Sequence, residues 1–153
     1  MKNIFSLLAI VIIGVVLVQC RVMNISKEQP LNLTRWDALG YYMYLPAAFV
    51  YNDFKQLSWL DEVDKQYNVT GGDGIPATKL EDGNYTSKYL SGVAIMQSPL
   101  FLAGHLIAGQ TGHPNDGFSP PYQYALGFGI MLYCMLALLL LRTILLRYFS
   151  DST

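Results

Sequence analysis

Residues 122–141 read YQYALGFGIMLYCMLALLLL and contain a single strongly polar side chain, Gln123. As a helix with a rise of 1.5 Å per residue, this run is long enough to cross the hydrocarbon core of a bilayer. A second apolar run covers residues 4–20, where only Ser6 and Gln19 are clearly polar. The two runs predict an all-α integral membrane protein, with two transmembrane helices that flank one large polar loop.

The charges next to these runs predict the orientation of the chain. Lys2 precedes the first run, Arg142 and Arg147 follow the second, and cytoplasmic flanks are enriched in such residues. Residues 21–121 carry a net charge of −3 and the remainder +2. We therefore expect a multi-pass protein of the cytoplasmic (inner) membrane, with both termini cytoplasmic and the loop facing outside, in the periplasm. The sequence has no basic patch, so nothing in its charge pattern indicates nucleic acid as a partner.

These boundaries divide the chain into four parts. The prediction is a first transmembrane helix at 1–23, an extracytoplasmic loop at 24–121, a second transmembrane helix at 122–147 and a cytoplasmic tail at 148–153. Within the loop, membrane-parallel interfacial helices are expected at about 34–51, 88–97 and 98–109.

Particular residues set the expected ends of the loop elements. Thr34 is expected to cap the first interfacial helix, and Pro46 to bend or end it. Pro99 is expected to divide the apolar stretch at 89–109 into two helices that are too short to cross a membrane. The Asp82-Gly83 pair predicts a small hairpin with a two-residue turn.

The first apolar run has two further interpretations. A charged start followed by a short apolar stretch is also typical of a cleavable secretory signal, but no small residues stand at the cleavage position. Leu17-Val18-Gln19-Cys20 is similar to a bacterial lipoprotein box, although Gln19 stands where a small residue is expected. We favour an uncleaved helix. Cys20 and Cys134 lie in apolar runs near opposite membrane faces, too far apart to form a disulfide.

Four blocks of sequence follow one another through the loop and into the second run. They are WDALGYYMYLP at 36–46, the Asp-Gly hairpin leading into KYLSGVA at 88–94, SPLFLAGH at 98–105 and DGFSPPYQ at 116–123. In this order the blocks resemble the N-terminal region of bacterial GT-C membrane glycosyltransferases, the class of the protein mannosyltransferase and aminoarabinose transferase relatives. Members of the class have many spans, so the chain resembles the opening segment of such an enzyme.

The resemblance implies a function and a set of site residues. It implies transfer of a sugar from a polyprenyl-phosphate-linked donor to an acceptor outside the cytoplasmic membrane, with Asp37 as the catalytic base. Lys88 is our candidate for the cation that stabilises the departing phosphate. Tyr41 and Tyr42 are candidates for lining a sugar or lipid groove. The implied partners are membrane lipid, the lipid-linked donor and the remaining spans of a longer chain or a neighbouring subunit.

Each assignment has a simpler alternative. Asp37 could only stabilise a helix start, Lys88 could snorkel at a membrane interface, and the tyrosines could form an interfacial aromatic belt. Some class members use a divalent metal, but the sequence shows no convincing ligand cluster, and residues 61–64 are better explained as a solvated acidic turn. The alternatives for the whole chain are a small two-span interaction protein without catalytic activity and a lipoprotein anchored at Cys20.

Overall fold

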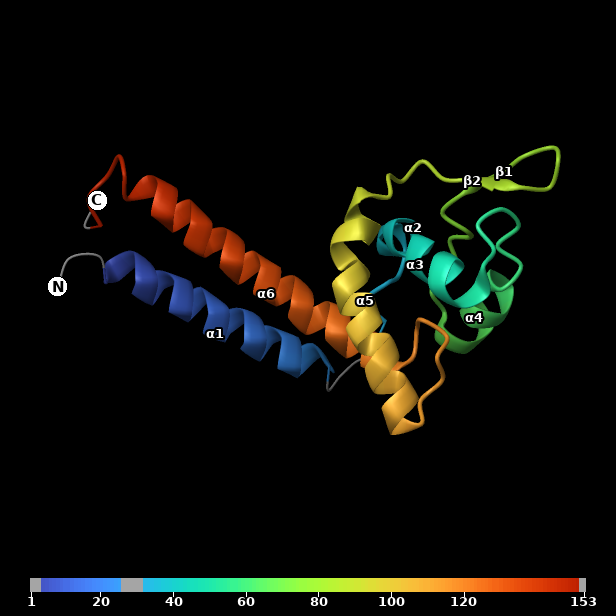
Figure 1. The fold of residues 1–153 in the computed structure, drawn as a ribbon, viewed down its shortest axis with the longest axis horizontal. Coiled ribbons are helices and arrows are strands. Elements are labelled where there is room, and N and C mark those ends of the chain that lie inside the picture. The colour runs from blue at the N-terminus through green and yellow to red at the C-terminus, as the bar shows by residue number, and fades with distance from the viewer. Residues whose placement is uncertain (1–3, 26–31, 152–153) are drawn as a thin grey trace. The chain divides into compact units, whose positions relative to one another are not determined.

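The computed structural model describes residues 4–25 and 32–151, and it is mostly helical, at 62% (Figure 1). The elements are α1 (Phe5–Ile25), α2 (Asp37–Tyr42), α3 (Tyr44–Pro46), the π-helix η1 (Ala47–Tyr51), α4 (Leu60–Tyr67), β1 (Thr78–Lys79), β2 (Tyr85–Thr86), α5 (Gly92–Thr111) and α6 (Pro120–Leu145). The chain divides into two compact units. We call Gln29–Leu126 the loop unit, and Met1–Glu28 with Gly127–Thr153 the helical pair.

Two helices of the described residues are long and apolar enough to cross a membrane, by length and composition alone: α5 and α6. α6 confirms that the decisive apolar run is helical. It begins at Pro120, a residue type favoured at the first helical position because it has no N–H to leave unpaired. In the first apolar run, Phe5–Arg21 counts as a shorter apolar helix, within an α1 that extends to Ile25.

α5 corrects the sequence analysis, because it runs without interruption through Pro99 (Figure 1). The expected division into helices at 88–97 and 98–109 is therefore wrong. Proline lacks the N–H that would bond to the carbonyl four residues earlier, which is that of Ile95. The Ser98 hydroxyl donates to this carbonyl at 2.8 Å and replaces the missing bond. The residue next to the proline thus helps the helix to continue.

The helical pair packs α1 against the second part of α6 in antiparallel fashion. Gly14 lies against the Met135 side chain, and at the other end Arg142 donates from Nε to the Ser6 hydroxyl at 2.8 Å. Asp151 accepts a hydrogen bond from the Phe5 N–H at 2.8 Å, which places a carboxylate at the start of α1, where the helix dipole favours it.

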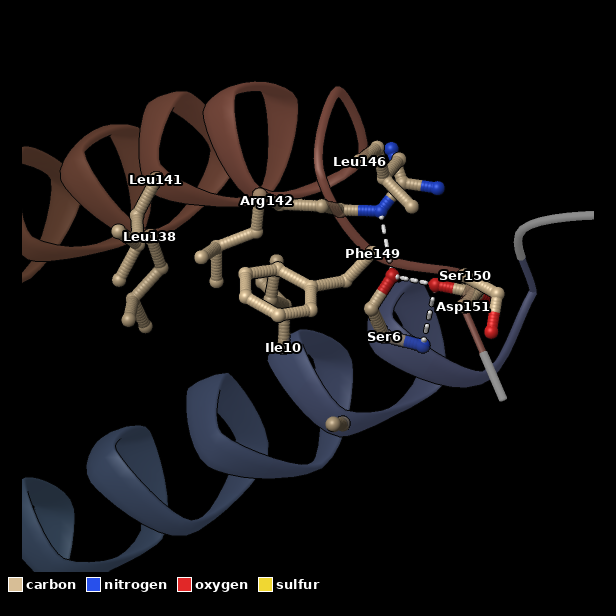
Figure 2. A pocket seen from close by; sticks show the side chains of 11 residues that line it. Ser6, Ile10, Leu138, Leu141, Arg142, Leu146, Phe149, Ser150 and Asp151 are labelled. Carbon is tan, nitrogen blue, oxygen red and sulfur yellow. Dashed lines mark hydrogen bonds between the residues drawn. The ribbon is translucent and has the colours of Figure 1, made fainter. Parts of the chain in front are cut away.

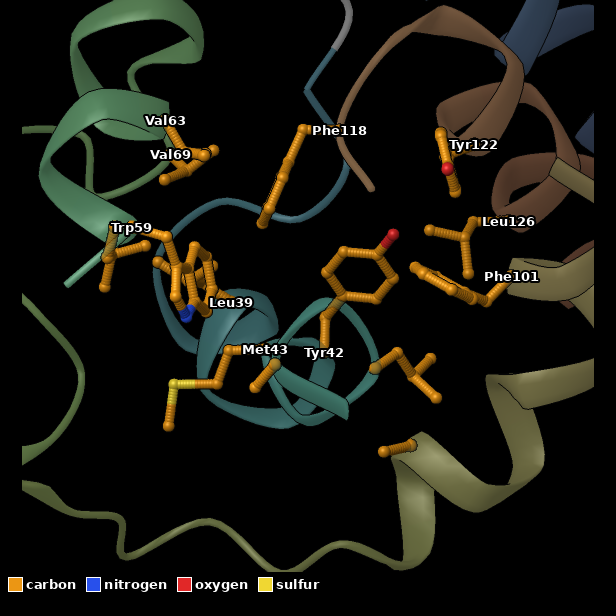
Figure 3. Packing of buried hydrophobic residues seen from close by; sticks show 14 of the residues in the cluster. Leu39, Tyr42, Met43, Trp59, Val63, Val69, Phe101, Phe118, Tyr122 and Leu126 are labelled. Carbon is orange, nitrogen blue, oxygen red and sulfur yellow. The ribbon is translucent and has the colours of Figure 1, made fainter. Parts of the chain in front are cut away.

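The loop unit is built around an aromatic core (Figure 3). Phe118 lies at its centre, with ring centroids 5.5 Å from Tyr42, 6.0 Å from Trp59 and 6.2 Å from Tyr67. Phe101 of α5 packs on Tyr42 and is fully buried. The core therefore joins α2, α4, α5 and the segment before α6, which are far apart in the sequence.

The first loop helix differs from expectation at one of its two marked residues. Thr34 is buried and makes no cap for α2, whose N-cap position is occupied by Trp36. Pro46 is the last residue of α3, so the α-helix ends there as predicted, although the chain continues into the wider η1. η1 ends at Asn52, which adopts the left-handed conformation with φ 52°. Asparagine tolerates this conformation better than most residues.

The predicted hairpin is present, with β1 and β2 antiparallel and Lys79 opposite Tyr85. Its turn is longer than the two residues expected. The Leu80 N–H bonds to the Asn84 carbonyl at 2.7 Å, and the Gly83 N–H bonds to the Leu80 carbonyl at 3.0 Å. Residues 80–84 therefore connect the strands, with three residues between the bonded pair Leu80 and Asn84, and Gly83 takes φ 84°, as in a turn that is followed by a bulge.

Candidate functional site

Asp37 lies at the start of α2 with its side chain exposed. The hydroxyl of Tyr89, 52 residues later, donates a hydrogen bond to Asp37 Oδ1. Among the residues that the structure describes, Oδ2 accepts no hydrogen bond that would compete with a ligand. The carboxylate of this exposed residue is thus oriented through one oxygen.

Tyr89 is held firmly, because both of its backbone groups are bonded. Its carbonyl accepts from the Tyr44 hydroxyl at 2.5 Å, and its N–H donates to Ser87 Oγ at 3.1 Å. The side chain is 8% exposed. The hydrogen bond to Asp37 raises the pKa of Tyr89 to about 12, with burial acting in the same direction. Tyr89 therefore remains a hydrogen-bond donor at neutral pH.

The ring of Tyr89 rests on Gly40, one turn after Asp37 on the same helix. A Cβ atom at Gly40 would lie 2.2 Å from Tyr89 Cδ2, so only glycine allows this approach. Tyr41 packs its ring edge-on against Tyr89, with centroids 4.8 Å apart and planes at 73°. The structure therefore brings two of the predicted site residues, Asp37 and Tyr41, onto one aromatic side chain.

Lys88 contacts the same ring. Its Nζ lies 5.2 Å from the Tyr89 ring centroid, a cation–π geometry, and the side chain is exposed. The predicted base and the predicted phosphate-binding cation are thus both in contact with Tyr89. We call Asp37, Tyr41, Lys88 and Tyr89 the Tyr89 cluster.

Tyr42 is not part of this cluster. Its ring is fully buried against Phe101 and Phe118, and its hydroxyl donates to the Gly117 carbonyl. Burial holds the pKa of Tyr42 well above its ordinary value. The structure places this residue in the core, so we do not propose that Tyr42 lines a sugar or lipid groove.

Trp36 gives the backbone before Asp37 an unusual conformation, with φ 56° and ψ −128°. Residues other than glycine rarely adopt a positive φ, which costs of the order of 1–3 kcal/mol unless the surroundings impose it. Three contacts impose it here: the Trp36 N–H bonds to the Val69 carbonyl at 3.2 Å, the indole lies on Gly71, and Arg35 lies 5.5 Å from the ring centroid. The strained residue directly precedes the candidate base.

Two side chains that organise the loop unit escaped the sequence analysis. Tyr89 stands in the block KYLSGVA, and only its position after Lys88 could have suggested a role. Asp116 organises the segment before α6: Oδ1 accepts from the N–H groups of Phe118 and Ser119, both at 2.8 Å, and Oδ2 accepts from the Tyr67 hydroxyl at 2.5 Å. With these bonds Asp116 serves the fold.

Each of the two units contains a pocket. The larger, of about 510 Å³, lies in the helical pair and is lined mostly by apolar side chains, with Ser6, Arg142 and Asp151 at one end (Figure 2). It contains no predicted site residue. A pocket of about 260 Å³ lies in the loop unit, and Tyr44, which bonds to Tyr89, lines it. In the described part of the chain, no group of three or more His, Cys, Asp or Glu side chains could hold a metal ion.

Comparisons with protein-family models, with curated proteins and with solved structures found no match for the chain.

Proposed function

We propose that the chain is the N-terminal part of an integral-membrane glycosyltransferase that moves a sugar from a polyprenyl-phosphate donor to an acceptor outside the cytoplasmic membrane. The observation that carries the proposal is the Tyr89 cluster, in which an exposed carboxylate and an exposed ammonium group contact one anchored tyrosine. In the proposed glycosyl transfer, a carboxylate acts as the base for the acceptor hydroxyl, and a cation stabilises the departing phosphate. The two residues stand in separate blocks of the resemblance, at 36–46 and at 88–94.

In the proposed reaction, Asp37 Oδ2 takes the proton of the acceptor hydroxyl while the oxygen of that hydroxyl attacks the anomeric carbon of the donor sugar. The bond between this carbon and the phosphate oxygen breaks, and its electron pair remains on the phosphate. Lys88 offsets the negative charge that develops there. Tyr89 orients the carboxylate through Oδ1 and keeps its own proton, and Tyr41 supports the ring of Tyr89.

The proposed orientation follows the charges: both termini in the cytoplasm and the loop unit outside. α5 supports a position along the outer membrane surface. One face of α5 is buried in the core through Ala94, Phe101 and Ala108. The other face exposes large apolar side chains, among them Ile95, Met96 and Leu106, which are 67%, 61% and 66% exposed. A helix with one protein-covered face and one uncharged apolar face suits the boundary between lipid and water.

The test uses membranes from cells that carry the changes in the natural gene, with radiolabelled polyprenyl-phosphate hexoses as donors. Asp37→Asn keeps the size of the side chain but removes its basicity, so we expect transfer to fall by about 10²–10⁴-fold with unchanged membrane insertion. Lys88→Ala is expected to weaken use of the donor more than use of the acceptor.

Asp73→Asn and Lys79→Ala are the matched controls, since both side chains are exposed and lie outside the Tyr89 cluster. They are expected to leave transfer unchanged. Normal transfer by the Asp37→Asn protein would remove Asp37 from the mechanism and overturn the proposal. Equal donor affinity with and without Lys88 would favour the snorkelling interpretation of that residue.

A further inference from the structure

The pocket of about 260 Å³ in the loop unit lies between two segments that a hydrogen bond connects. The Tyr85 N–H donates to the Lys55 carbonyl at 2.7 Å, which ties β2 to the loop that follows η1. Phe54 and Leu57 line the pocket from this loop, and Thr86 and Ser87 line it from the hairpin side. The cavity is therefore part of the folded unit.

The lining side chains define the chemistry of an occupant. Met43, Ala47 and Leu57 provide apolar contact, and all three are buried. Phe54 adds an aromatic ring that is 54% exposed. Thr86, Ser87, Tyr44 and Tyr85 carry hydroxyl groups. The Tyr44 hydroxyl already donates to the Tyr89 carbonyl and can still accept, and Ser87 Oγ already accepts from the Tyr89 N–H and can still donate. None of the lining residues, all of which the structure describes, carries a charge.

A neutral sugar ring matches this combination. It has C–H surfaces that can contact an aromatic ring and hydroxyl groups that pair with side-chain hydroxyls, and it brings no charge into a site without a counter-charge. The volume lies near the lower limit for small-molecule pockets, which is about 300 Å³, and so suits a single ring.

Two lining residues connect the pocket to the Tyr89 cluster. The Tyr44 hydroxyl and Ser87 Oγ hold the carbonyl and the N–H of Tyr89, whose hydroxyl bonds to Asp37. We infer that this pocket binds one neutral hexose-sized ring beside the Tyr89 cluster. The inference rests on the proposed function in identifying that ring as a sugar of the transfer reaction.

The test measures binding of methyl α- and β-D-glucopyranoside and mannopyranoside to the full chain in lipid nanodiscs, by saturation-transfer NMR. We expect millimolar affinity, a loss of about tenfold in Phe54→Ala and a loss of about threefold in Thr86→Val. Thr78→Val changes the same type of side chain on β1, outside the pocket, and is expected to bind like the unchanged protein. Glucuronate, which is charged, is expected to bind at least tenfold more weakly than the neutral glycosides.

Three results would overturn the inference: no saturation transfer from any neutral glycoside at about 50 mM, equal affinity in Phe54→Ala, or preference for glucuronate. Asp37→Asn separates the pocket from the reaction, since it is expected to keep glycoside affinity within about twofold. Glycoside binding together with normal transfer by Asp37→Asn would refute the catalytic proposal and keep the pocket. Loss of transfer in Asp37→Asn without glycoside binding to any form would refute the pocket alone.

Discussion

The loop unit and the helical pair use apolar residues in opposite ways. The loop unit packs a buried aromatic core and pairs most of its buried polar groups, with Gln97 Oε1 as an exception among the described residues. In the described residues of the helical pair, Ile10 at 7% exposure is the only buried hydrophobic side chain. Most of its described valines, leucines and isoleucines are exposed instead. Hydropathy therefore reports only how apolar a segment is. The packing of the segment is needed to tell whether protein covers its apolar side chains or leaves them for lipid.

The largest expected effect distinguishes the two units by a change in each. Phe118→Ala removes the central ring of the core and should lower the free energy of unfolding of the loop unit by about 3–5 kcal/mol. Leu140→Ala removes a side chain of the helical pair that is 66% exposed. This change should alter the free energy of unfolding of the loop unit by less than about 0.5 kcal/mol. Both tryptophans lie in the loop unit, so their fluorescence during urea unfolding in detergent follows this unit alone. Equal effects would contradict the comparison.

A smaller effect is expected within the first turns of α6, where the loop unit ends. Gln123 is 1% exposed, and its Oε1 accepts from the Leu33 N–H at 2.7 Å. Gln123→Leu makes the apolar run more hydrophobic but leaves that N–H unpaired, so we expect a loss of about 1–3 kcal/mol in the same assay. Tyr124→Leu, at a neighbouring position that is 41% exposed, serves as the control. A higher free energy of unfolding for the Gln123→Leu protein would mean that the added apolar side chain matters more in this turn than the hydrogen bond from Leu33.

The smallest effect concerns pH. Although partial burial acts in the opposite direction, hydrogen bonds from the N–H groups of Ser58, Gln56 and Lys55 and from the Ser58 hydroxyl lower the pKa of Asp53 to about 2 from 3.8. A lowered folded-state pKa stabilises the fold above the ordinary value, and this stabilisation is lost as the pH falls from about 4 to about 2. Asp53→Asn should therefore differ most from the unchanged protein at pH 7. A stability difference that persisted undiminished at pH 2 would refute this origin.

The helical nature of α6 could be predicted from sequence because a long uncharged apolar run has few alternatives. α5 could not be predicted in full, since the effect of Pro99 depends on which way the Ser98 hydroxyl points. The hairpin was predicted by its Asp-Gly pair, but the length of its turn was not, because the strand register decides which of the two residues takes the positive φ.

The candidate site also contains features that could be predicted from the sequence and features that could not. Asp37 and Tyr41 lie one helical turn apart, so their common face could be inferred from spacing. Tyr42 could have been separated from them by the same rule, because it shares the opposite face with Leu39 and Pro46, both buried. The role of Tyr89 could not, since a contact across 52 residues depends on how the whole loop unit packs.

The close approach at Gly40 gives a way to recognise distant relatives. Even a methyl group there would meet the Tyr89 ring, so a chain that preserves the bond between this ring and Asp37 is expected to have glycine three positions after the acid. An acid, a glycine and a far-off lysine-tyrosine pair form a pattern that can be sought in genomes where overall similarity has faded. Such a pattern follows a spatial constraint, which tends to outlast the surrounding sequence.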